Sequence, residues 1–193
     1  MKKAIIVGAT SGIGKGLAAK LVEENWMVGI TGRRTTLLQE IKSRTPNKII
    51  IKVQDITDLE NSEVQMNGLF QQIGTVDLFI VSSGFGETNQ KLDWTLEKKT
   101  IDTNVNGIAK VYEFAFSKFK EQGHGHLVGI SSIASVRGNR FCPAYSAAKA
   151  FQANYLEALR GISKKRNLKI KVTDVQPGFV DTAWDQGYFG WLR

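Results

Sequence analysis

A tyrosine and a lysine stand four positions apart in the segment Tyr145-Ser146-Ala147-Ala148-Lys149. On a helix this spacing puts both side chains on one face, one turn apart. An ammonium group beside a phenol favours the phenolate and lowers a pKa that is ordinarily about 10. Such a tyrosine serves as a general acid or base near neutral pH. The same spacing is commonplace on exposed helices, so the pair alone does not define a site.

A second segment has the composition of an anion-binding turn. Gly8-Ala9-Thr10-Ser11-Gly12-Ile13-Gly14 follows an apolar run and precedes a helical pattern. Glycines let the turn tighten and let its backbone approach a pyrophosphate, whose charge rests on the free N–H groups of the helix start. The spacing is G-x-x-x-G-x-G rather than the general G-x-G-x-x-G, and glycine also serves any tight turn. Because this turn lies between a predicted strand and a predicted helix, it predicts a dinucleotide site.

The loop after the second apolar run indicates which dinucleotide binds. Arg33 lies about 20 residues beyond the glycine turn, where an acid would bind a ribose hydroxyl and an arginine would bind a 2′-phosphate. Thr31-Gly32-Arg33-Arg34 holds no carboxylate. Because a guanidinium binds phosphate through two parallel hydrogen bonds, the sequence favours NADP(H), with NAD(H) as the alternative. The competing interpretation is an ordinary exposed loop arginine.

The elements that must position these residues alternate between strands and helices. Six short apolar runs, mostly continuous in apolar character, predict strands buried on both faces: Ala4–Val7, Val28–Thr31, Ile49–Val53, Asp77–Val81, His126–Ile130 and Ile170–Val175. Of the helices between them, the first is expected to end at a left-handed Asn25, and Thr57 opens a capping box for a later one. The alternation predicts an α/β fold with a doubly wound, mostly parallel sheet and helices on both faces. We expect a single domain over residues 1–193.

Composition places the chain among ordinary globular proteins. Apolar residues make up 42% and charged residues 23%, which argues against disorder. The single cysteine, Cys142, excludes an internal disulfide and fits a reducing compartment. No apolar run approaches the roughly 18 residues of a membrane span, and the N-terminus does not resemble a secretory signal. We therefore expect a cytoplasmic protein with no membrane partner.

The net charge of +8 favours anionic partners, or serves only solubility. No nucleic-acid-binding motif accompanies the charge, so nucleic acid is not expected as a partner. His124 and His126 lie two positions apart, but no cluster of carboxylates or cysteines accompanies them. We therefore expect no metal site.

Together these motifs resemble the short-chain dehydrogenase/reductase family, from Met1 to about Thr182. The glycine turn and the Tyr145–Lys149 pair match it, as does Ser132, thirteen residues before the tyrosine. Further matches follow in the family's order: Asp55 after the third strand, Asn104 in the fourth helix, and Pro177-Gly178-Phe179-Val180-Asp181-Thr182 after the sixth strand.

The resemblance implies a Rossmann fold and hydride exchange between a nicotinamide and a carbonyl or alcohol substrate. It makes Tyr145 the group that exchanges the proton, with Lys149 lowering the pKa of the phenol and holding the nicotinamide ribose. Ser132 donates a hydrogen bond to the substrate oxygen, and Asn104 positions a water that links Lys149 to solvent. The implied cofactor-binding residues are Gly8, Thr10, Ser11, Gly12, Ile13, Gly14, Arg33, Asp55, Ile56, Ser83, Gly84, Tyr145, Lys149, Pro177, Gly178, Val180 and Thr182.

The resemblance also implies a homodimer or homotetramer that pairs the long helices after Asn104 and Tyr145. An alternative function is a regulatory protein that binds the dinucleotide without turning it over. The chain ends eleven residues after Thr182, so the family's seventh strand and most of its substrate lid are expected to be missing.

Overall fold

Six apolar runs form one sheet in the computed structural model, which describes residues 1–180. The strands are β1 Lys3–Val7, β2 Met27–Gly32, β3 Ile49–Val53, β4 Leu78–Val81, β5 His124–Ile130 and β6 Lys169–Val175. Their order in the sheet is β3-β2-β1-β4-β5-β6, and every pairing is parallel. This is the doubly wound order of the Rossmann fold, so the predicted fold class is confirmed. No seventh strand pairs with the sheet within residues 1–180.

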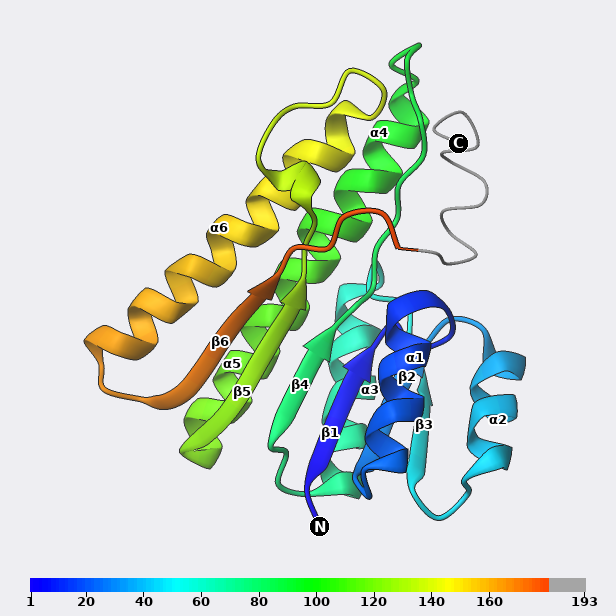
Figure 1. Cartoon of the computed structure of the whole chain (residues 1–193), viewed down its shortest axis with the longest axis vertical. Coiled ribbons are helices and arrows are strands. Elements are labelled where there is room, and N and C mark those ends of the chain that lie inside the picture. The colour runs from blue at the N-terminus through cyan, green and yellow to red at the C-terminus, as the bar shows by residue number, and fades with distance from the viewer. Residues whose placement is uncertain (181–193) are drawn as a thin grey trace.

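The connecting helices lie on both faces of the sheet (Figure 1). They are α1 Gly12–Glu23, α2 Thr35–Arg44, α3 Leu59–Ile73, α4 Trp94–Ile101, α5 Ile108–Gln122 and α6 Pro143–Lys165. A short π-helix, η1 Asp102–Gly107, joins α4 to α5, and a 3₁₀ turn, η2 Ile133–Ser135, follows β5. In Figure 1 α1 lies in front of the sheet, whereas α5 and α6 lie behind it.

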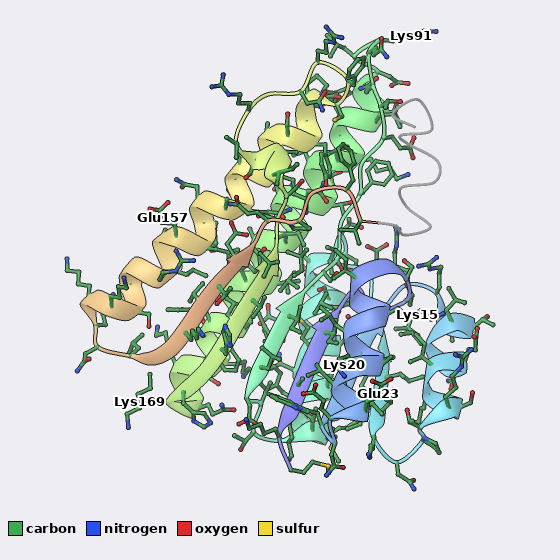
Figure 2. All side chains as sticks on the ribbon, in the orientation of Figure 1. Lys15, Lys20, Glu23, Lys91, Glu157 and Lys169 are labelled. Atoms are coloured by element: carbon green, nitrogen blue, oxygen red, sulfur yellow. The ribbon has the colours of Figure 1, made fainter. Side chains whose placement is uncertain are left out.

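Alternate side chains of each central strand enter two separate cores, as the period of a strand requires. On β1, Ile5 and Val7 pack with residues of α3, α5 and α6, whereas Ile6 packs with residues of α1 and α2. Charged side chains stay outside these cores, as Lys20 on α1 and Glu157 on α6 show in Figure 2. The strands β1 and β4 are therefore apolar on both faces, as predicted.

The strand β6 departs from that pattern. Ile170 and Val172 are buried against α6, but Lys169 and Lys171 are exposed. In Figure 1 no helix of residues 1–180 lies in front of β5 and β6. Half of β6 therefore faces solvent within the described part of the chain, which explains why this run alternates apolar and polar residues.

Local capping partly follows the sequence predictions. Asn25 has φ 65° directly after α1, as expected of a left-handed helix end. The N-cap of α3 is Asp58 rather than the predicted Thr57, because the Asp58 carboxylate accepts the Asn61 N–H at 3.2 Å. Thr57 instead donates its hydroxyl to Asp55 at 2.8 Å.

No helix among residues 1–180 is long and apolar enough to cross a membrane.

Candidate active site

A cavity of about 570 Å³ lies at the carboxyl ends of the strands. In an open parallel sheet, ligands bind at this edge where the strand order reverses, which is between β1 and β4 here. The predicted site residues that line the cavity are Gly8, Thr10, Ser11, Gly12, Ile13, Arg33, Asp55, Ile56, Ser83, Gly84, Ser132, Tyr145, Lys149, Pro177, Gly178 and Val180. Gly14 and Asn104 lie behind its wall, and Thr182 falls outside the described residues.

The glycine turn folds tightly between β1 and α1. Gly8 has φ +89°, and a Cβ there would lie 2.5 Å from the Ser83 backbone nitrogen. A Cβ on Gly14 would lie 2.2 Å from the Gly8 carbonyl oxygen. Gly8 therefore permits the left-handed turn and Gly14 permits the close approach of α1 to it.

The N-terminus of α1 suits an anionic group. Ser11 is its N-cap residue, but the Ser11 hydroxyl makes no capping hydrogen bond to the first turn. Ser11, Gly12 and Ile13 line the cavity, so the N–H groups of a helix start lie at its wall. These free donors and the helix dipole fit a pyrophosphate, the group that the turn was predicted to bind.

Two neighbouring arginines lie where β2 leaves the sheet. The Arg34 guanidinium donates to Thr10 Oγ1 at 2.7 Å and to Ser11 Oγ at 2.8 Å, so it covers the glycine turn. Arg33 lies 3.8 Å from an Asp55 carboxylate oxygen, and both residues line the cavity. The spacing predicted a phosphate contact for Arg33, whereas Arg34, the next residue, is the one bound to the turn.

Tyr145 and Ser132 meet inside the cavity. Ser132 lies two residues after the end of β5 and caps η2, where its Oγ accepts the Ala134 N–H at 3.1 Å. Tyr145 lies in the first turn of α6. Burial raises the pKa of Tyr145 to about 12, while a hydrogen bond with Ser132 acts in the opposite direction. The sequence predicted a lowered pKa from Lys149. In this structure burial outweighs the hydrogen bond with Ser132, so the net shift of the Tyr145 pKa is upward, and its lowering by Lys149 stays a prediction.

Lys149 lies beneath the tyrosine. Its Nζ is 5.7 Å from the centre of the Tyr145 ring and donates to the Ile130 carbonyl at 3.0 Å. The side chain is only 5% exposed, and this burial lowers the pKa of Lys149 to about 8, against a smaller raising effect of Asp174. A buried ammonium with so low a pKa is poised to exchange protons near neutral pH.

Asn104 holds the loop after β4 through its side chain. Its Oδ1 accepts the Phe85 N–H at 2.8 Å, and its Nδ2 donates to the Phe85 carbonyl. The residue is fully buried within η1. Its backbone carbonyl accepts the side-chain amide of Gln152 at 2.8 Å. The water that the resemblance implied at Asn104 stays a prediction.

Gln152 was not found by sequence reasoning. It lies on α6 three residues after Lys149, and its Oε1 accepts the Lys149 ammonium at 3.1 Å. The spacing to Lys149 could have indicated this residue, because residues three apart on a helix share a face.

Among the described residues no group of three or more histidine, cysteine, aspartate or glutamate side chains is placed to hold a metal ion.

Comparisons with known proteins agree with this geometry. The family model described as short chain dehydrogenase matches residues 2–192. An uncharacterised oxidoreductase of Myxococcus xanthus is 34% identical over 184 residues, covering 93% of this chain and 72% of the relative. An uncharacterised oxidoreductase of Staphylococcus aureus is 30% identical over 190 residues, covering 97% and 81%.

Solved structures share the fold. The actinorhodin polyketide ketoreductase with NADPH has a TM-score of 0.88 at 24% identity, covering 96% of this chain and 73% of that one. A 3-ketoacyl-(acyl-carrier-protein) reductase from Brucella melitensis with NADH has a TM-score of 0.89 at 21% identity, covering 97% and 79%. The Escherichia coli serine dehydrogenase has a TM-score of 0.84 at 26% identity, covering 92% and 83%.

The parallel sheet, the glycine turn and the Ser132–Tyr145–Lys149 cluster define a Rossmann-fold oxidoreductase. With a family model matching nearly the whole sequence, the chain belongs to the short-chain dehydrogenase/reductase family.

Proposed function

We propose that the protein is an NADP(H)-dependent oxidoreductase that exchanges a hydride between the nicotinamide and a carbonyl or alcohol substrate. The observation that carries this proposal is the meeting of a proton-transfer cluster, Ser132–Tyr145–Lys149, with an uncapped helix start in one cavity. A regulatory protein that only binds the dinucleotide would not need the cluster. Its presence favours catalysis.

The residues present fit a bound dinucleotide. Backbone N–H groups from Ser11 to Ile13 would hold the pyrophosphate. Arg33 and Arg34, which both line the cavity, would hold a 2′-phosphate. Further contacts would come from Asp55, Ile56, Ser83, Gly84, Pro177, Gly178, Val180 and Thr182. The names of similar structures include both NADPH and NADH, so the arginines are what favour NADP(H).

Proton management belongs to the chain's own residues. When bound, the nicotinamide supplies or accepts the hydride. Tyr145 Oη donates its proton to the carbonyl oxygen during reduction and takes it back during oxidation. Ser132 Oγ donates a hydrogen bond to the same oxygen, where negative charge develops. Because burial opposes the phenolate, the Lys149 ammonium is needed to stabilise it, and Lys149 would also hold the ribose hydroxyls.

We propose one catalytic domain over residues 1–193, acting in the cytoplasm as a homodimer or homotetramer. Phe151 and Tyr155 on α6 support a helix-pairing interface, because both are only partly buried and their rings lie 5.6 Å apart. Phe114 and Phe119 on α5 instead belong to the core of the single chain. The substrate proposed is a small carbonyl or alcohol, with neither nucleic acid nor membrane as a partner.

Replacement of Tyr145 by phenylalanine tests the mechanism. NADPH oxidation is followed by absorbance with a panel of aldehydes and ketones, and NADPH binding is followed by fluorescence. We expect Tyr145→Phe to lose at least about a hundredfold in kcat, the usual contribution of general acid catalysis, while NADPH still binds. A Tyr145→Phe protein with full activity would contradict the mechanism. Binding without turnover by the unaltered protein would favour the regulatory alternative.

A further inference from the structure

Gln152 lies between two parts of the site that the fold brings together. It is 1% exposed on α6, and its amide makes two hydrogen bonds. Oε1 accepts the Lys149 ammonium at 3.1 Å, and Nε2 donates to the Asn104 carbonyl at 2.8 Å. The amide therefore connects Lys149 on α6 to the backbone of η1.

The chemistry of the two partners fixes the orientation of this amide. A lysine ammonium only donates hydrogen bonds, and a backbone carbonyl only accepts them. The side chain between Lys149 and Asn104 must therefore offer one acceptor and one donor. Glutamine does so with a single planar group. A leucine offers neither, and a glutamate turns a carboxylate oxygen toward the carbonyl.

The π-helix makes the Asn104 carbonyl available. In a regular helix this carbonyl would accept the Ile108 N–H, four residues on. That N–H instead donates to the Thr103 and Val105 carbonyls. A buried carbonyl without a partner is costly, and Gln152 supplies the partner. Bulges of this kind are frequent at functional sites.

We propose that Gln152 is a positioning residue for Lys149, holding the ammonium at the cavity wall and tying it to the freed Asn104 carbonyl. The side chain of Gln152 makes this link directly, with one hydrogen bond to each partner. The catalytic value of this link rests on the proposed function, because it acts through Lys149 on Tyr145. The link itself is a property of the folded chain and is measurable without cofactor or substrate.

The other groups that face Lys149 set the background for a titration. Asp174 on β6 raises the pKa of the ammonium. Tyr145 on α6 presents its ring to Lys149, and β5 presents the Ile130 carbonyl. None of these contacts changes when Gln152 is replaced by a side chain of similar size.

The test is an NMR titration of the Lys149 side chain in protein labelled with ¹⁵N at lysine Nζ. The Lys149 resonance is assigned by its loss in Lys149→Met. Gln152→Leu removes the acceptor, so the pKa of Lys149 is expected to fall by about one to two units, the scale of a hydrogen bond to a charged group. Gln152→Glu places a carboxylate there, so the pKa is expected to rise above that of the unaltered protein.

Ser163→Ala is the matched control, because Ser163 is also buried on α6 and donates to the Ile170 carbonyl at 2.6 Å, away from the cavity. It is expected to leave the Lys149 titration unchanged. An unchanged titration in Gln152→Leu would overturn the proposal. If neither Gln152 variant folds, the NMR resonances of the Gln152 side-chain amide are followed in the unaltered protein. Their chemical shifts are expected to change with pH at the same midpoint as the Lys149 resonance. Chemical shifts that do not change at that midpoint would also overturn the proposal.

This result is separate from the proposed function. Failure to oxidise NADPH with any carbonyl would overturn the oxidoreductase proposal but would leave the Lys149 titration as it is. In an active protein, Gln152→Leu is also expected to move the pH profile of kcat in the direction of its Lys149 shift, whereas Ser163→Ala is not.

Discussion

Burial controls the charge of the two side chains at the centre of the site. Tyr145 and Lys149 lie in the cavity wall, where desolvation disfavours the charged form of each. The pKa of the phenol is therefore raised to about 12 and that of the ammonium is lowered to about 8. The sequence showed the pair and its spacing. It did not show the depth at which the pair is buried, and that depth decides the direction of the Tyr145 shift.

The lowered pKa of Lys149 makes stability depend on pH. The unfolded chain keeps this proton up to the ordinary pKa of 10.5, whereas the folded protein releases it near 8. Between these values the unfolded state binds more protons, so the free energy of unfolding rises with pH. The rise from pH 7 to pH 10 is expected to be about 3 kcal/mol. Above pH 10 the raised pKa of Tyr145 acts in the opposite direction.

Urea unfolding at several pH values checks this expectation. Lys149→Met should show no rise from this source between pH 8 and pH 10, although it keeps the fold. A rise of the same size in Lys149→Met would mean that another group causes it.

The position of Arg34 predicts its effect on cofactor choice. Because Arg34 rather than Arg33 contacts the glycine turn, we expect Arg34→Ala to weaken NADPH binding by about tenfold or more and NADH binding far less. Arg44→Ala is the control, since Arg44 pairs with Glu40 on α2 and does not line the cavity. Fluorescence titration with both cofactors measures the difference. Equal losses for NADPH and NADH would show that Arg34 does not read the 2′-phosphate.

At the scale of the elements, the turn between β1 and α1 depends on close backbone contact. Gly14 and Gly16 lie two residues apart on α1, yet a Cβ on Gly14 meets the Gly8 carbonyl at 2.2 Å and a Cβ on Gly16 meets nothing within 4 Å. Gly14→Ala is expected to lower the free energy of unfolding by about 3 kcal/mol through overpacking. Gly16→Ala is expected to raise it by about 0.5–1 kcal/mol through helix propensity.

Thermal or urea unfolding of the two variants provides the comparison. The two substitutions are expected to change the free energy of unfolding in opposite directions. A harmless Gly14→Ala would show that α1 can move away from the turn without cost.

The elements that were predicted well are those with strong apolar patterns. All six strands lie within two residues of their predicted bounds, and β3 has its predicted bounds, because the apolar runs stand out from the polar segments beside them. The helices α2 and α4 were not identified, since α2 buries only Leu38 and Ile41, and α4 buries only Thr100. The π-helix η1 was also missed. This helix is accompanied by tertiary contacts that no local pattern predicts. Asn104 is hydrogen-bonded to Phe85, and Gly107 packs closely against the Ile56 carbonyl.

At the scale of the molecule, the sheet order brings the site together. The crossover between β1 and β4 places the glycine turn beside Ser83 and Gly84, and β5 and α6 add Ser132 and Tyr145. The family pattern predicted which segments meet there. It did not predict the contact of Gln152 with the Asn104 carbonyl, because such a contact depends on how far a side chain reaches in the packed fold.

Deuterium transfer from labelled NADPH tests the central claim most directly. NADPH carrying deuterium at both hydrogen positions of nicotinamide C4 is incubated with the protein and a carbonyl compound that supports NADPH oxidation, and the product is examined by mass spectrometry. We expect one deuterium on the former carbonyl carbon of the alcohol and a loss of this transfer in Tyr145→Phe. An alcohol without the label, or no alcohol from any carbonyl while NADPH binds, would contradict the central claim.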